Sequence, residues 1–120
     1  SRNTSAPRSV VAKRRACSVD WSATAAADLR TIIENIARDS VSAATAVLER
    51  IGAHASRLRS FPSRGRIVPE LEDQGIRSYR ELIVTPWRII YKIEARKVRV
   101  LAVLDARRNL EDLLLERFLR

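Results

Sequence analysis

Residues 76–108 read IRSYRELIVTPWRIIYKIEARKVRVLAVLDARR, and this stretch decides the fold. Three runs rich in β-branched and aromatic residues, at 76–84, 87–94 and 97–104, are separated by Thr85-Pro86 and Ala95-Arg96. Runs of this length joined by short turns predict three consecutive antiparallel strands, a β-meander. Proline is not favoured at the second position of a two-residue hairpin turn, which leaves a longer first turn open.

Two-residue turns would fix the register of the meander and therefore the two faces of its sheet. Val84 then faces Trp87, and Glu94 faces Lys97. Because side chains alternate along a strand, one face is apolar apart from Arg80 and is expected to receive the helices. This face carries Leu82, Val84, Trp87, Ile89, Tyr91, Ile93, Val98, Val100, Ala102 and Leu104.

The opposite face of the meander is mixed in character. Its expected cross-strand rows are Tyr79–Lys92–Arg99, Glu81–Ile90–Leu101 and Ile83–Arg88–Val103. The like charges of Lys92 and Arg99 lie opposite each other, an arrangement that normally costs stability. The apolar residues of these rows would form an exposed patch beside basic groups, which is typical of a binding surface. Alternatively, the C-terminal helix covers this patch.

Two helices are expected before the meander. Residues 16–21 alternate weakly and predict a first strand, after which Ser22 stands where a helix N-cap belongs. One apolar stripe comprises Leu29, Ile32, Ile33 and Ile36, and a second comprises Ala44, Val47, Leu48, Ile51, Ala55 and Leu58. Asp39 and Ser40 interrupt the pattern between them, so the two helices should form an antiparallel hairpin with one apolar stripe on each.

A breaker-rich loop and a last helix complete the expected domain. The loop spans residues 61–75 and holds two prolines and two glycines. The last helix should begin with Asn109 as its cap and is apolar on more than one side. We therefore predict an α+β fold of order β-α-α-β-β-β-α, with the helical hairpin packed on a four-stranded antiparallel sheet. The single domain covers residues 16–120 and follows a flexible basic arm at residues 1–15.

The charge of the chain narrows the choice of partners. The net charge is +9 among 120 residues, and arginines supply nearly all the positive charge, since only Lys13, Lys92 and Lys97 are lysines. Such a surface favours polyanions or an acidic protein partner. Codon usage in a GC-rich genome explains the choice of arginine equally well, but it does not explain the net excess. No apolar run approaches the roughly 20 residues that span a bilayer, so no membrane partner is expected.

The other chemistry-bearing residues give weak signals. Cys17 is the only cysteine, so no internal disulfide forms, and no Cys/His set has metal-ligand spacing. We expect a cytoplasmic protein without metal or cofactor. His54 lies mid-helix and is interpreted as a surface or packing residue, and Tyr91 is interpreted as core. Glu81 is interpreted either as a base or, preferably, as the salt-bridge partner of Arg88 or Lys92.

Four motifs together resemble the RelE/ParE superfamily of bacterial toxins: FPSRGRIVPEL (61–71), IRSYRELIV (76–84), PWRIIYKIE (86–94) and VRVLAVLDARR (98–108). They match the family's "GR-x-VPE" loop, "REL" strand, "YRIIY" strand and "H-x-RR" end. The resemblance covers about residues 19–110. It implies the toxin of a type II toxin–antitoxin module, with a cognate antitoxin as its partner.

The resemblance also implies one of two targets. ParE-like members inhibit DNA gyrase, and RelE-like members cut mRNA in the ribosomal A site. For a nuclease, the resemblance implies Arg88 on the scissile phosphate, Arg107 or Arg108 as a second cation and Glu81 as a base. This chain departs from the nuclease pattern: Asp105 stands where many members have a histidine, and no tyrosine or histidine follows Arg108. These departures favour gyrase inhibition, with a ribosome-dependent endoribonuclease as the alternative. A third alternative is a protein of this fold that has lost toxicity and only binds the antitoxin.

The surface expected to bind the target or the antitoxin consists of the open sheet face and its neighbouring loops. It comprises Tyr79, Arg80, Arg88, Lys92, Arg99, Arg107, Arg108, Arg64 and Arg66.

Overall fold

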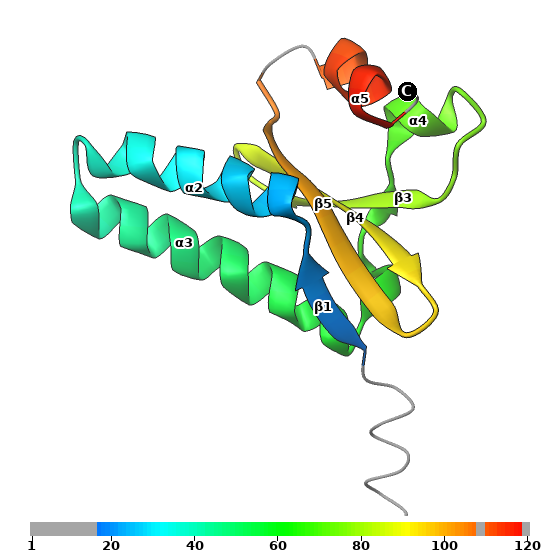
Figure 1. The fold of residues 1–120 in the computed structure, drawn as a ribbon, viewed down its shortest axis with the longest axis horizontal. Coiled ribbons are helices and arrows are strands. Elements are labelled where there is room, and N and C mark those ends of the chain that lie inside the picture. Colours follow the sequence, from blue (N-terminus) through cyan, green and yellow to red (C-terminus); the bar gives the residue numbers. More distant parts are fainter. Residues whose placement is uncertain (1–16, 108–109, 119–120) are drawn as a thin grey trace, which may run out of the picture.

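The computed structural model describes residues 17–107 and 110–118, and Figure 1 shows their arrangement. The predicted arm at 1–15, the side chain of Arg108 and the cap at Asn109 lie outside the described residues. The elements are β1 (Ser18–Trp21), α2 (Ala23–Ala37), α3 (Val41–Ser56), η1 (Arg57–Arg59), η2 (Pro62–Arg64), β2 (Arg66–Ile67), α4 (Pro69–Glu72), β3 (Tyr79–Val84), β4 (Trp87–Glu94), β5 (Lys97–Asp105) and α5 (Leu110–Phe118).

The α+β class and the helical hairpin on a sheet are confirmed, but the sheet differs from the prediction in two details. It has five strands in the order β1-β5-β4-β3-β2 rather than four. The extra strand, β2, is only Arg66–Ile67 and pairs with Glu81 and Arg80 of β3. The first strand, β1, runs parallel to β5, so the sheet is mixed rather than fully antiparallel.

Serine caps begin both helices of the hairpin. The Ser22 hydroxyl accepts a hydrogen bond from the Ala25 amide at 3.0 Å, as the sequence predicts. Ser40, which was expected only to interrupt the pattern, accepts from the Ala43 amide at 3.1 Å and begins α3. Each hydroxyl satisfies one of the amides that a helix N-terminus leaves unpaired. Three residues after Ala37 are therefore enough to reverse the chain.

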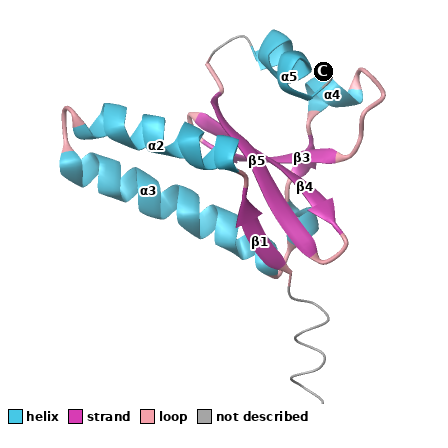
Figure 2. Cartoon of the chain, viewed as in Figure 1, coloured by secondary structure: helices cyan, strands magenta, loops and turns pink. Residues whose placement is uncertain are grey.

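The hairpin covers one face of the sheet, and the two short helices α4 and α5 lie at the other (Figure 2). The core under the hairpin includes Ile51, Leu58, Ile89, Tyr91 and Val98, each with no exposed surface. On the second face a smaller core joins the sheet to α4 and α5. Its buried members are Val68, Leu71, Ile90, Ala102, Leu104 and Leu114.

The predicted exposed patch on the second face is largely wrong. Ile90 is fully buried and Val103 is 3% exposed, while Leu101 is half-buried and only Ile83 is exposed, at 48%. Ile90 lies under the core that α4 and α5 complete. The alternative expectation, that the C-terminal helix covers this face, therefore describes most of it. Burial of this apolar area is favourable by about 25 cal/mol per Å², which explains why the apolar last helix packs against the second face of the sheet.

The predicted meander register is right for all of β3–β4 and for the half of β4–β5 next to its turn, and it is wrong for the other half of β4–β5. Both turns have two residues, with Val84 opposite Trp87 and Glu94 opposite Lys97. A bulge between Ile90 and Tyr91 shifts the β4–β5 pairing by one residue. Because side-chain direction alternates, a one-residue shift moves every later side chain to the opposite face.

The bulge changes three assignments in β5. Ala102 faces Ile90, and Leu104 faces Arg88, in place of the predicted Leu101 and Val103. Ala102 and Leu104 accordingly pack in the core beside α5, not under the hairpin. Val103 was expected on the open face but belongs to the hairpin core.

Candidate functional site

Arg88, the residue expected to contact phosphate, lies at the centre of a partly buried charge network made of Arg66, Glu70, Glu81 and Arg88. Arg88 is 6% exposed and Glu81 is 1% exposed. The Arg88 Nε donates to Glu81 Oε1, and its two terminal nitrogens donate to the Glu70 carboxylate at 2.8 and 2.7 Å. The other oxygen of Glu81 accepts from Arg66 Nε at 2.6 Å.

The network is electrically balanced, and the pairing of Arg88 with Glu70 favours the charged form of both. Its two arginines face two carboxylates, so no net charge is buried. The hydrogen bond from Arg88 lowers the pKa of Glu70, although partial burial acts in the opposite direction. That same hydrogen bond is the main reason why the pKa of Arg88 is raised. Satisfied pairing of this kind makes buried charges tolerable, and it leaves no nitrogen of Arg88 without a carboxylate partner in this chain.

Sequence reasoning paired Glu81 with Arg88 correctly but placed them on an open face, and that exposure is wrong. The physical reason is cover from α4, whose Glu70 takes both terminal nitrogens of Arg88. Glu70 was not expected at the site. The signal for it was present in the VPE motif, since a carboxylate in a loop beside a strand arginine is a ready bidentate partner.

The remaining predicted binding residues are dispersed. Arg107 is exposed and binds its neighbour Asp105 at 2.7 Å. Arg80 donates to the Gly65 carbonyl at 2.7 Å and so holds the loop. Arg64 is exposed, and Arg99 is half-buried.

Tyr79 and Lys92 form a small cluster at the edge of the second core. The Lys92 ammonium lies 5.5 Å from the centre of the Tyr79 ring, which stacks at a tilt on Phe118. Lys92 also lies 3.6 Å from the Glu94 carboxylate, which offsets the like charge of Arg99 opposite it. Tyr79 is half-buried and is therefore a packing residue of α5 as well as a surface one.

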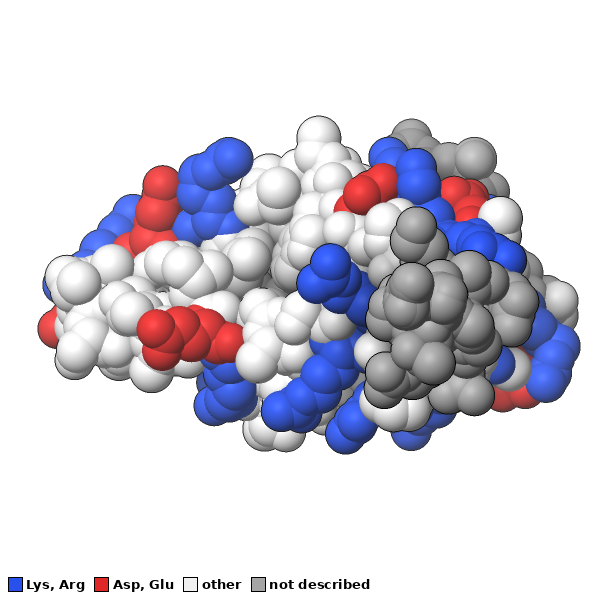
Figure 3. All heavy atoms as spheres, turned by 90° about the horizontal axis from the view of Figure 1, so that it is seen from below, with Lys and Arg blue, Asp and Glu red and all other residues white. Residues whose placement is uncertain are grey.

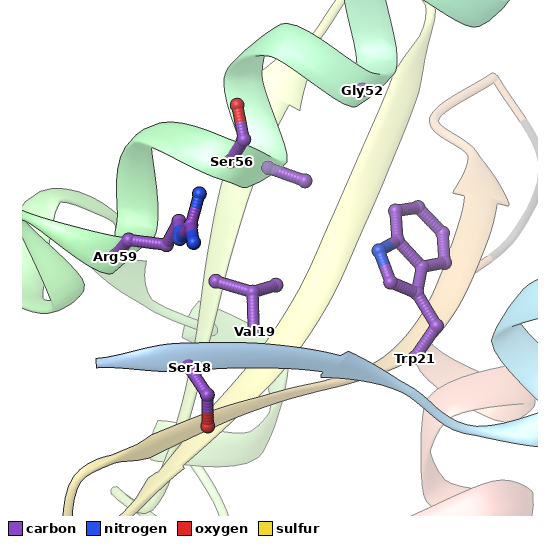
Figure 4. A pocket seen from close by; sticks show the side chains of 7 residues that line it. Ser18, Val19, Trp21, Gly52, Ser56 and Arg59 are labelled. Atoms are coloured by element: carbon purple, nitrogen blue, oxygen red, sulfur yellow. The ribbon is translucent and has the colours of Figure 1, made fainter. Parts of the chain in front are cut away.

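The structure also has an open groove that sequence reasoning did not identify. A pocket of about 300 Å³ lies between β1 and the end of α3, and its lining includes Val19, Trp21, Gly52 and Arg59. Figure 4 shows Val19 and Trp21 pointing from β1 towards α3, with Arg59 reaching in from the helical side. A Cβ added to Gly52 would meet no atom within 4 Å, so the pocket is open above this glycine.

A second pocket, of about 440 Å³, continues along the hairpin, and Trp21 lines both. The second pocket is almost entirely apolar, with Leu29, Ile33 and Leu48 among its walls. Leu48 is 44% exposed, although the sequence pattern placed it in the buried stripe. We call the two pockets together the Trp21 groove. Arg59 lies at one end of the groove, and Arg30 and Glu34 lie at its apolar end.

The described part of the chain gives no support for a metal site or for a membrane-spanning helix. Within residues 17–107 and 110–118, no three His, Cys, Asp or Glu side chains come together as metal ligands would. His54 is half-buried, and its pKa is lowered first by burial and then by nearby Arg57, Arg64 and Arg50. Tyr91 is fully buried, as expected, and burial raises its pKa. No described helix has both the length and the apolar character needed to cross a bilayer.

Comparison with known proteins agrees with this geometry. The chain is similar to Toxin ParE3 of Caulobacter vibrioides, with 36% identity over 81 residues that cover 68% of this chain and 74% of that protein. Its fold is similar to a chain in the solved "Chromosomal ParDE TA system from P. aeruginosa", with a TM-score of 0.62, 18% identity, and coverage of 76% and 97%. A family model, "ParE toxin of type II toxin-antitoxin system, parDE", matches residues 19–110. Since that match spans most of the sequence, the chain belongs to the ParE family of type II toxins.

Proposed function

We propose that this toxin is held inactive by a cognate antitoxin and that, when released, it inhibits DNA gyrase in the cytoplasm. The choice of target depends on one observation, which is that Arg88 is buried and paired within the chain. Every nitrogen of its guanidinium is already paired with a carboxylate of this chain. A scissile phosphate would have to displace the buried carboxylate of Glu81 and the partly exposed one of Glu70 to reach it, and that displacement would leave unpaired charge behind.

The alternative, a ribosome-dependent endoribonuclease, needs a free base and a second cation near Arg88. Glu81 is the only base candidate from the sequence, and both of its oxygens accept from arginines. A base must reach the proton that it removes, and Glu81 is 1% exposed. Arg107 is bound to Asp105 and does not join the network. The geometry therefore favours a toxin that acts by binding rather than by cutting RNA.

The antitoxin is proposed to dock in the Trp21 groove. The apolar stretch between Trp21 and Leu48 fits the apolar side chains of a helix, which would lie along α2 and α3. Arg59 at the other end offers a guanidinium for an acidic side chain. A solved ParDE system shares the fold, which supports a protein partner of this class.

The target is tested by two measurements on one preparation. The purified toxin is added to gyrase with relaxed plasmid, and separately to a ribosome translation reaction with a mapped mRNA. We expect loss of supercoiling and uncut mRNA. A stoichiometric amount of cognate antitoxin should restore supercoiling. Codon-spaced cuts in the mRNA with normal supercoiling would exclude the gyrase proposal.

The groove is tested with a matched pair at Gly52. Gly52→Ala adds a Cβ into open space and should leave antitoxin affinity nearly unchanged, with slightly higher stability because alanine favours a helix. Gly52→Trp fills the pocket beside Trp21 and should weaken antitoxin binding by at least about tenfold, since a displaced interface anchor typically costs about 2 kcal/mol. Calorimetry on both variants checks this expectation. Equal affinity of the two variants would remove the groove from the antitoxin interface.

A further inference from the structure

Residues 57–66, RLRSFPSRGR, form a surface of which the proposed function uses only Arg59. This segment, here called the arginine loop, leads from α3 through η1 and η2 into β2. It carries four arginines and no acidic residue. Leu58 anchors it in the hairpin core with no exposed surface, whereas Phe61 is 63% exposed.

The backbone of the arginine loop is held firmly from beneath. The Tyr91 hydroxyl donates to the Pro62 carbonyl at 2.7 Å and accepts from the Gly65 amide at 2.9 Å. Arg80 donates to the Gly65 carbonyl at 2.7 Å. A Cβ at position 65 would lie 2.4 Å from the Glu81 carbonyl, so only glycine allows this close approach. The loop therefore presents its outward side chains from a fixed backbone, at little further cost in entropy on binding.

The outward side chains combine one aromatic ring with several cations. Phe61 and Arg64 are neighbours on the wall of a shallow, open pocket of about 420 Å³. Arg57 and Arg64 lie close enough to His54 to lower its pKa, after the larger effect of burial. Among the described residues, neither arginine side chain makes a hydrogen bond or salt bridge. Figure 3 shows Lys and Arg side chains gathered along the middle of the face seen from below, with few acidic ones among them.

We propose that the arginine loop binds single-stranded nucleic acid. Arg57 and Arg64 would take backbone phosphates, because a guanidinium donates two parallel hydrogen bonds to a phosphate. Phe61 would stack on an unpaired base, which offers an aromatic face whatever its identity. An acidic polypeptide matches the charge, but the pocket beside Phe61 is shallow and open, whereas the apolar anchors of peptides enter enclosed concave pockets.

The test uses fluorescence anisotropy with labelled oligothymidylate of about 16 nucleotides, a length within the range that single-strand sites cover. The same measurement is repeated with the oligothymidylate paired to its complementary strand and with poly-L-glutamate. These controls are needed because a chain of net charge +9 binds any polyanion to some degree. The probes contain no gyrase and no antitoxin, so the result is independent of the proposed function.

We expect Phe61→Ala to weaken binding of the single strand by about tenfold and Phe61→Tyr to retain it. Arg57→Gln with Arg64→Gln should reduce the salt dependence of log K by about 1.4, the value for two lost phosphate contacts to a single strand. The matched control is Arg38→Gln with Arg77→Gln, two exposed arginines elsewhere, which should leave that slope unchanged.

The inference is overturned if Phe61→Ala binds oligothymidylate as tightly as the parent, or if the two double variants behave alike. Tighter binding of poly-L-glutamate, with no effect of Phe61, would assign the surface to an acidic polypeptide and also overturn it. Circular dichroism of each variant excludes loss of fold as the cause.

Discussion

A single arginine illustrates how burial changes the chemistry that a motif suggests. In sequence, Arg88 is a cation on a strand of mixed character, suited to bind phosphate. In the fold, it is 6% exposed and neutralised by Glu70 and Glu81, two residues that lie 18 and 7 positions before it. Arg88 therefore contributes to stability by neutralising the carboxylates of Glu70 and Glu81, and its pairing with them opposes binding of an external phosphate.

The first prediction concerns Arg88→Met. Removing the cation leaves the fully buried side chain of Glu81 with only the exposed Arg66 as partner. Breaking a buried pair in this way costs about 3–5 kcal/mol in the free energy of unfolding. Urea denaturation followed by circular dichroism measures the loss. The control is Arg107→Met at an exposed ion pair, which should change stability by no more than about 0.5 kcal/mol. A loss of similar size at both positions would mean that the network is not structural.

The second prediction concerns the pH dependence of stability through Glu70. Its folded pKa lies below the ordinary value of 4.5, mainly because Arg88 donates to it. A lowered carboxyl pKa stabilises the fold above the unfolded pKa, and this contribution is lost as pH falls through the folded pKa. Glu70→Gln should therefore reduce stability at about pH 7 and should matter less at about pH 3. Urea midpoints at both pH values, for parent and variant, test this. Carboxylates common to both proteins cancel, and a constant difference between the two pH values would contradict the prediction.

At the scale of elements, sequence periodicity predicts most of the fold. The apolar stripes place both helices, Ser22 marks the start of the first, and the β-rich runs place three strands, because these signals act over neighbouring residues. The bulge in β4–β5 was not predictable, since Leu101, Ala102, Val103 and Leu104 are all apolar and show no alternation to reveal the shift. Strand β2 has only two residues between breakers, which is too short to give a periodic signal.

The candidate sites were predictable to a smaller extent, because they depend on contacts between distant segments. The Glu81–Arg88 pair follows from strand register, which the turns fix. The Trp21 groove does not follow from sequence, because it exists only once β1 has paired with β5 beside α3. The exposed side of the hairpin at Leu48 was missed for a similar reason: a helical stripe shows which residues are apolar but not how far the sheet extends beneath them.

The third prediction concerns the attachment of α5. The Asp28 carboxylate on α2 accepts from Arg117 at 3.0 and 3.1 Å and from the Val103 amide at 3.0 Å. Arg117→Gln removes the charged bond to α5 while Asp28 keeps its backbone contact to β5. A charge-assisted hydrogen bond that is partly exposed contributes about 1 kcal/mol, so amide exchange in α5 should quicken about fivefold. Hydrogen exchange measured by mass spectrometry checks this. The exposed Glu116→Gln serves as the control, and equal quickening throughout α2 and α3 would contradict a local clamp.

At the scale of the whole molecule, charge and groove have separate roles in recognition. The net charge of +9 acts over distances comparable with the Debye length, roughly 10 Å at 0.1 M salt, before any contact forms. The Trp21 groove acts only after contact, through apolar burial that salt does not weaken. Charge should therefore govern the rate of association with an acidic partner, and the groove should govern the rate of dissociation.

The fourth prediction follows from this separation and concerns the kinetics of antitoxin binding. Raising salt from about 0.05 to 0.5 M should lower the association rate constant by about tenfold or more and change the dissociation rate constant by less than about twofold. Arg38→Glu, at the hairpin turn and outside the lining of the groove, should slow association alone. Gly52→Trp, inside the groove, should speed dissociation alone. Stopped-flow fluorescence resolves the two rates. An association rate constant that does not change with salt would show that the excess of arginine does not steer the antitoxin. The positive charge would then need a different explanation, such as nucleic-acid binding at the arginine loop.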